Sequence, residues 1–155
     1  MFNRNFFLVL IYFFLVNCGF TPLYKDIKNI DFSIEIDKAE GNETLNNFIK
    51  LNLKNYTINN KTNKKLIISL NSNYYKNTVA KNISGISTEY ELVSDIEFTI
   101  KYGDKTKKIN FTEKINLKNL NNTFDEINYE KSYMNNSALI IVKKLILELV
   151  NLDDF

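Results

Sequence analysis

The chain of 155 residues has no histidine and no tryptophan, and it contains one cysteine, one proline and four glycines. Histidine is the commonest general base and the commonest metal ligand, so its absence argues against acid–base and metal-dependent catalysis. A single cysteine, Cys18, cannot form an intramolecular disulfide. The sequence also lacks a glycine-rich phosphate-binding loop. We therefore expect a protein that is not an enzyme and that needs no cofactor or metal ion.

Charges of both signs are nearly balanced, with 20 Lys and Arg against 18 Asp and Glu. This balance gives no general reason to propose nucleic-acid binding. Four carboxylates alternate along one predicted strand: Glu89, Glu91, Asp95 and Glu97. Two of them could form a catalytic pair, but no other residue pattern supports a paired acid and base. We interpret the four carboxylates as the solvated face of a strand.

The first 17 residues have the features of a signal peptide. Arg4 is the only arginine of the chain, and an unbroken apolar run follows at residues 6–16. Eleven residues suit the apolar region of a signal peptide, whereas a membrane-spanning helix needs about 20. The segment that ends in Asn17-Cys18-Gly19 resembles a bacterial lipobox, although Asn17 replaces the usual Gly, Ala or Ser. The sequence predicts a signal peptide at residues 1–17 and a lipid on Cys18.

The lipid anchor would place the mature protein in a bacterial cell envelope. Two or more acyl chains on Cys18 would hold it firmly at a membrane. Gly19, rather than an aspartate, follows the cysteine, and this favours the outer membrane. The mature chain, residues 18–155, is long enough to form one domain with its own core.

Apolar and polar residues alternate in four segments, which indicates four strands with one buried face each. These strands are expected at residues 32–36, 66–74, 86–102 and 109–117. Gly103-Asp104 closes a tight hairpin between the last two, because glycine supplies the positive φ that such turns require.

Two segments have apolar residues at the 3–4 spacing of amphipathic helices. The first spans residues 45–56, with Asn42 or Thr44 as its N-cap. The second begins with a capping box at Thr123 and Glu126 and continues to about residue 152. Its apolar stripe is wide enough to cover a sheet. We therefore predict an α+β domain, ordered β-α-β-β-β-α, with two helices packed on one face of a mostly antiparallel four-stranded sheet.

The segment from Cys18 to Tyr24 reads Cys-Gly-Phe-Thr-Pro-Leu-Tyr. It resembles the start of the mature LPS-assembly lipoproteins, the LptE family, and in particular its alphaproteobacterial type, which begins Cys-Gly-Phe-basic-Pro-Leu-Tyr. Thr21 replaces the basic residue, and Glu89 stands where that family often has arginine. The predicted order of elements is also similar, so the resemblance covers essentially the whole chain, although only the opening is specific.

This resemblance implies an outer-membrane lipoprotein on the periplasmic side. Such a protein plugs an LptD-like β-barrel, assists its assembly and takes part in lipopolysaccharide transport to the outer leaflet. The resemblance also implies lipopolysaccharide contact through basic residues at loop ends. The matching residues are Lys76 and Lys81, in a predicted loop at residues 74–81, and Lys105, Lys107 and Lys108, in the hairpin at residues 101–108.

Other interpretations stay open. The five lysines could pair with lipid A phosphates, or they could only protect strand ends from pairing. The chain could serve another envelope machine, such as β-barrel insertion or lipid trafficking, since the anchor and a small α+β domain would suit that as well. A periplasmic hydrolase would require a carboxylate pair in a cleft.

Overall fold

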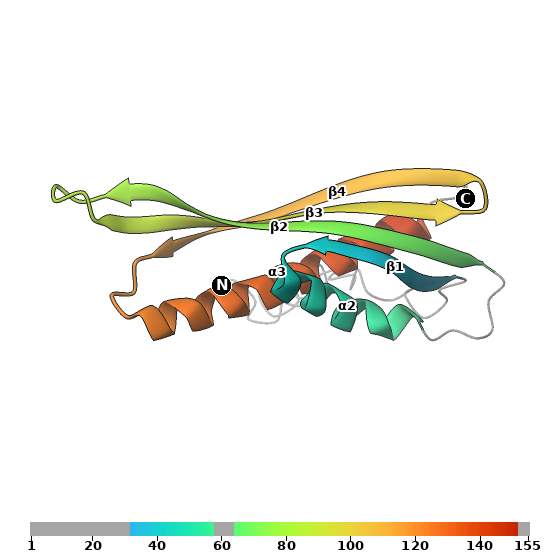
Figure 1. Cartoon of the computed structure of the whole chain (residues 1–155), viewed down its shortest axis with the longest axis horizontal. Coiled ribbons are helices and arrows are strands. Elements are labelled where there is room, and N and C mark those ends of the chain that lie inside the picture. Colours follow the sequence, from blue (N-terminus) through green and yellow to red (C-terminus); the bar gives the residue numbers. More distant parts are fainter. Residues whose placement is uncertain (1–31, 58–63, 152–155) are drawn as a thin grey trace, which may run out of the picture. The chain divides into compact units, whose positions relative to one another are not determined.

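The computed structural model describes residues 32–57 and 64–151, which form two helices and four strands (Figure 1). The elements are β1 (Ser33–Gly41), α2 (Glu43–Thr57), β2 (Lys65–Lys81), β3 (Ser87–Tyr102), β4 (Lys105–Lys118) and α3 (Thr123–Val150). This order is the predicted one, β-α-β-β-β-α. The predicted signal peptide, Cys18 and the segment that resembles LptE lie outside the described residues.

The four strands form one mixed sheet in the order β1-β2-β3-β4. β1 is parallel to β2, and α2 makes the crossover between them, as a parallel connection requires. β3 is antiparallel to both of its neighbours, so the sheet is mostly antiparallel, as predicted. Because β1 and β2 run the same way, Ser33 lies at the end of the sheet that also holds Lys65 and the turn at Gly103.

Both helices cover the same face of the sheet (Figure 1). The core lies between these two layers and is built from the alternating residues of the strands and the apolar stripes of the helices. Fully buried members are Leu45, Ile49, Leu53, Leu66, Ile68, Ile96, Phe98, Ile100, Ile141, Leu145 and Ile146. Within the described ranges, no helix combines the length and the apolar character that crossing a membrane requires.

A polar cluster joins the start of α2 to the middle of β2. The Asn42 side chain caps the helix, since its Oδ1 accepts a hydrogen bond from the Leu45 N–H at 2.9 Å. The buried Ser72 hydroxyl donates to Asn46 Oδ1 at 2.8 Å. The Asn46 amide in turn donates to the Glu40 carbonyl at 3.0 Å. The structure thus confirms Asn42, one of the two predicted caps, and adds an anchor for the β1–α2 connection.

The predicted capping box at the start of α3 is wrong. Asn122 is the N-cap, with extended backbone angles, and its side chain accepts a hydrogen bond from the Phe124 N–H. Asn is a stronger N-cap than Thr, so the helix begins one residue earlier than the capping box requires. Thr123 becomes the first helical residue, and the Glu126 carboxylate is directed to Lys76 instead.

The loop predicted at residues 74–81 is also wrong, because β2 continues as a strand to Lys81. Its pairing with β3 extends from Ile67, opposite Lys101, to Lys81, opposite Ser87. Main-chain pairing continues here although both faces of the strands become exposed, so alternation of apolar residues no longer marks the strand. The connecting loop is confined to residues 82–86.

Candidate functional site

The five lysines predicted to contact lipopolysaccharide lie in two groups along β3: two are opposite its first six residues and three are opposite its last four. Lys76 and Lys81 belong to the β2–β3 hairpin, whereas the other three follow the Gly103 turn at the start of β4. β3 has 16 residues, so about 50 Å of strand separates its two ends. The β2–β3 hairpin extends past the first turn of α3 (Figure 1). The structure therefore offers two distinct basic sites.

Lys76 is held inside a group of side chains that we call the hairpin clamp: Lys76, Tyr74, Tyr90, Glu126 and Glu130. The Lys76 ammonium forms ion pairs with Glu126 and, at 2.8 Å, with Glu130. It also lies 4.3 Å from the centre of the Tyr90 ring, a cation–π distance. The Tyr74 hydroxyl donates to Glu130 at 2.8 Å. The clamp joins the hairpin to the first half of α3 and neutralises the Lys76 charge.

Lys81 differs from Lys76 in its surroundings. Its side chain is exposed near the tip of the hairpin, and no ion pair joins it to another residue in the described part of the chain. The segment between Lys76 and Glu89 contains no acidic residue. The hairpin tip is thus locally basic, which suits an anionic ligand.

The loop at the hairpin tip, residues 82–86, has a defined conformation. Asn82 Oδ1 accepts hydrogen bonds from the main-chain N–H groups of Ser84, at 3.0 Å, and Ile86, at 2.9 Å. Gly85 adopts a φ of 77°, a region that glycine enters without strain. These bonds fix a turn on which Ile83 is fully exposed. The tip therefore presents a basic residue, Lys81, and an apolar residue, Ile83, two positions apart in the sequence.

At the other end of the sheet, Lys108 is paired with Glu97 across the strands at 2.9 Å. The outer face of β3 contains further cross-strand partners, because Asp95 accepts a hydrogen bond from Thr112 at 2.6 Å and Glu91 lies 3.6 Å from Lys114. Three of the four alternating carboxylates thus face polar partners on β4. This agrees with their interpretation as a solvated strand face.

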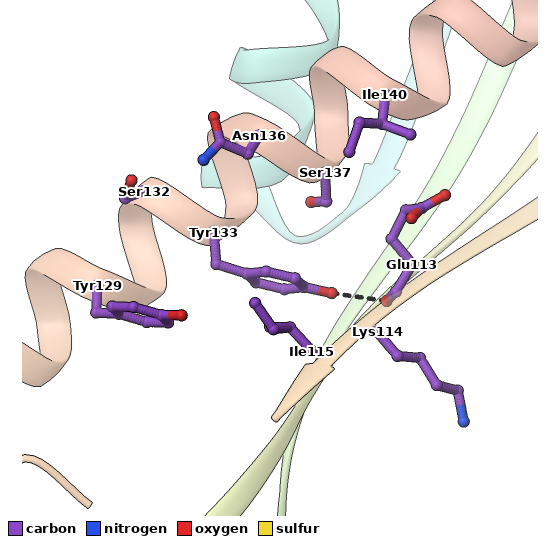
Figure 2. Close-up of a pocket in the computed structure, with 9 residues that line it drawn as sticks. All are labelled: Glu113, Lys114, Ile115, Tyr129, Ser132, Tyr133, Asn136, Ser137 and Ile140. Carbon is purple, nitrogen blue, oxygen red and sulfur yellow. Dashed lines mark hydrogen bonds between the residues drawn. The ribbon is translucent and has the colours of Figure 1, made fainter. Parts of the chain in front are cut away.

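A tyrosine of α3 reaches into the sheet, and no pattern in the sequence predicts this contact. The Tyr133 hydroxyl accepts a hydrogen bond from the Ser94 N–H at 3.0 Å and donates to the Glu113 carbonyl at 2.6 Å. Ser94 and Glu113 face each other in the β3–β4 register, so this hydroxyl bridges the two strands. Figure 2 shows its bond to Glu113. The buried Ser137 hydroxyl donates to Ser94 Oγ at 3.0 Å. Tyr133 thereby fixes the distance between α3 and both strands.

A cavity of about 230 Å³ opens beside Tyr133, between α3 and β4. Figure 2 shows α3 side chains on one side and β4 on the other, with Lys114 directed away from the helix. The apolar lining residues are large and half exposed: Ile115 at 40%, Tyr129 at 37% and Ile140 at 43%. Ile140 belongs to the apolar stripe predicted to cover the sheet, but here it borders the cavity instead.

Alkaline pH is expected to destabilise the fold through Tyr74 and Tyr133. Burial raises the pKa of both phenols above the ordinary value of 10, and the Glu130 carboxylate raises the pKa of Tyr74 further. The unfolded chain therefore releases these protons first. Their contribution to stability is complete below pH 10 and falls as the pH rises toward the folded-state pKa. Between pH 8 and 11, the free energy of unfolding in urea should fall more steeply for the native protein than for the Tyr74→Phe, Tyr133→Phe double variant.

Comparisons with known proteins give structural similarity only. No protein-family model matches the chain, and none of the curated proteins is similar to it in sequence. A crystal structure of rare lipoprotein B from Shewanella oneidensis superposes with a TM-score of 0.54 at 18% identity, covering 76% of this chain and 99% of that one. A Caulobacter crescentus protein gives a TM-score of 0.48 at 15% identity, covering 75% and 86%. Lipoprotein B from Nitrosomonas europaea gives 0.46 at 12% identity, covering 77% and 84%.

At these identities the likeness concerns the fold and not the function. The Shewanella structure is matched over almost its entire length, so the similarity includes the whole architecture and not one motif. The described domain therefore shares its fold with rare lipoprotein B.

Proposed function

We propose that this chain is an outer-membrane lipoprotein that binds and plugs an LptD-like β-barrel and assists lipopolysaccharide transport to the outer leaflet. It would be anchored through Cys18 and would face the periplasm. The proposal assigns it no catalytic role and no cofactor. Its work would depend on shape and charge.

The main support for this proposal is the agreement between the amino-terminal segment and the fold of the domain. The chain begins with a short apolar leader that ends at Cys18, and the next six residues are similar to the start of mature LptE proteins. The domain that follows has the fold of a protein named rare lipoprotein B. The leader and the domain are independent observations, and both indicate a lipid-anchored envelope protein.

The surface of the domain suits a water-filled barrel lumen. The outer face of the sheet carries charged residues in cross-strand pairs, such as Lys108 with Glu97, and not an apolar layer. Such a face stays hydrated and can lie against the polar interior of a large barrel. The β2–β3 hairpin, which extends past α3, would contact parts of the barrel lumen beyond the rest of the domain.

The anchor can be tested with Cys18→Ser. The native chain, expressed with a C-terminal tag in a Gram-negative host, is expected in the outer-membrane fraction with acyl chains on its amino-terminal cysteine. The Cys18→Ser variant is expected to lose the lipid and to leave that fraction, because acyl chains supply the binding energy at the membrane. Mass spectrometry of the N-terminal peptide and membrane fractionation measure both results. A native chain that keeps residues 1–17 and carries no lipid would contradict the proposal.

The partner can be tested by affinity purification from detergent-solubilised outer membranes. An LptD-like barrel should be recovered with the tagged chain in comparable amounts. Recovery of a different barrel or of a pump instead would favour the second candidate, an accessory lipoprotein of another envelope machine. The two candidates share the anchor and the fold, so the identity of the partner distinguishes them.

Lys81→Gln is expected to weaken lipopolysaccharide binding at least about tenfold. A charge-assisted contact contributes about 1.5–3 kcal/mol, and 1.4 kcal/mol corresponds to a factor of ten in affinity.

Neutralising Lys105, Lys107 and Lys108 together tests the other basic end, which lies too far from Lys81 for one lipid A headgroup to contact both. Binding to immobilised lipopolysaccharide measures each variant, with urea unfolding as the control for folding. Loss of binding only in the triple variant would indicate that lipopolysaccharide binds at the β3–β4 turn and not at the hairpin tip.

A further inference from the structure

β4 is an edge strand in the described part of the chain, because its pairing is with β3 alone. The Asn119 N–H donates to the Thr88 carbonyl of β3. The Glu113 carbonyl is also directed toward β3, because the Tyr133 hydroxyl that it accepts from is bonded to the Ser94 N–H of that strand. Main-chain groups of a strand alternate between its two edges. The N–H and C=O groups of Thr112, Lys114 and Asn116 are therefore directed to the open edge, where another strand can pair with them.

The cavity beside Tyr133 lies on the helix side of this same segment. It is lined by Ile115 from β4 and by Tyr129 and Ile140 from α3, and its volume of about 230 Å³ is below the usual 300–1,000 Å³ of small-molecule sites. Its size suits one or two side chains. A strand added at the edge would direct alternate side chains to the helix side, and one of them could enter the cavity.

The charge of β4 indicates what kind of strand would bind. The strand contains five lysines and one glutamate, a formal net charge of +4. The glutamate, Glu113, is paired with Lys144 at 2.5 Å, and two of the lysines, Lys108 and Lys114, face Glu97 and Glu91 of β3 at 2.9 and 3.6 Å. These contacts leave the strand with an excess of positive charge. Two copies of β4 placed edge to edge would bring like charges together, which is unfavourable, whereas an acidic strand would be attracted. The edge therefore favours an acidic partner over a second copy of this chain.

We propose that the open edge of β4 and the adjacent cavity bind an extended, acidic segment of a protein partner by strand addition. Main-chain hydrogen bonds to Thr112, Lys114 and Asn116 would provide affinity, and one apolar side chain in the cavity would fix the register. This interaction goes beyond the proposed anchoring and lipopolysaccharide contact, since neither uses the edge of β4 near Lys114.

The test uses the full chain, purified in detergent, and a fluorescent peptide of eight residues in which glutamate alternates with valine around a central leucine. Fluorescence anisotropy at low salt should show saturable binding. Two control peptides isolate the causes: one has lysine in place of glutamate, and one has methylated amides on alternate residues. Both are expected to bind at least about tenfold more weakly, because the first reverses the charge and the second removes the edge hydrogen bonds.

Variants of the protein complete the test. Lys114→Pro removes an N–H that points to the open edge, and proline is tolerated on edge strands, so the fold should persist. It should raise the peptide Kd about tenfold, whereas Lys114→Gln keeps the N–H and should raise it less than about threefold. Ile140→Ser, at an exposed position bordering the cavity, should weaken binding by a similar factor of about ten.

Three results would overturn the proposal. The acidic peptide could fail to bind. The methylated peptide could bind equally well, which would reduce the effect to charge alone. The chain could instead self-associate through β4, with Lys114→Pro restoring the monomer. In the first case, the lysines of β4 would serve only to protect an edge from pairing.

Discussion

Gly41→Ala is expected to lower the free energy of unfolding by about 3–5 kcal/mol. Gly41 ends β1 with a φ of 92°, a region that costs a residue with a Cβ about 1–3 kcal/mol. A Cβ at this position would also lie 1.9 Å from the Ser72 carbonyl oxygen, on the main chain of β2. That oxygen accepts a hydrogen bond from the Asn42 N–H at 2.8 Å, so moving it away from the Cβ would weaken this hydrogen bond. Overpacking of this kind adds about 1–3 kcal/mol.

Gly85→Ala is the matched control. Gly85 also has a positive φ, 77°, but no atom lies within 4 Å of the position its Cβ would take. This variant isolates the conformational cost of a Cβ at positive φ, which we expect to be about 1–2 kcal/mol. Urea unfolding followed by circular dichroism compares the two. Equal losses at both glycines would show that the close approach to Ser72 is unimportant.

Tyr133→Phe is expected to cost about 2–4 kcal/mol. The hydroxyl is the shared partner of the Ser94 N–H and the Glu113 carbonyl, and its removal leaves both without their bond. An unsatisfied buried polar group costs about 1–3 kcal/mol. The ring itself stays packed against Leu92 and Leu117, so the effect should come from the hydroxyl.

Tyr75→Phe controls for the loss of a hydroxyl in general, because its ring is exposed on β2 and the change should stay within about 0.5 kcal/mol. Thermal unfolding of the two variants gives the difference. A stable Tyr133→Phe protein would mean that β3 and β4 close and bond to each other directly. Hydrogen exchange at the Ser94 amide would then show protection equal to that of the native protein.

The sequence predicted the order of elements and the buried face of each strand because alternation and helical spacing depend only on local residue patterns. Leu45, Ile49 and Leu53, for example, repeat at the spacing of one helix face and are all fully buried. The part of β2 after Tyr74 was not predicted, since the sequence around Lys76 and Asn77 has no alternation of apolar and polar residues. This part forms a strand only through its pairing with β3.

The polar contacts of the core were also missed, although the sequence contains a signal for them. Ser72 and Ser94 both occupy inward positions in otherwise apolar alternations, and both are fully buried. A buried hydroxyl requires a partner. The identity of that partner could not be predicted, because Asn46 and Tyr133 approach from helices whose packing depends on the whole fold. For the same reason, the pairing of Lys76 with Glu126 and Glu130 could not be predicted from their separation in sequence.

The parallel pairing of β1 with β2 gives the sheet two unlike ends. The chain enters at Ser33, at the end that holds the Gly103 turn, and the loop at Ile83 lies at the opposite end, beyond the hairpin clamp. A tether attached before Ser33 would therefore restrain the end of the sheet that holds the Gly103 turn. The hairpin tip at Ile83, about 50 Å away along the strands, would stay free to move.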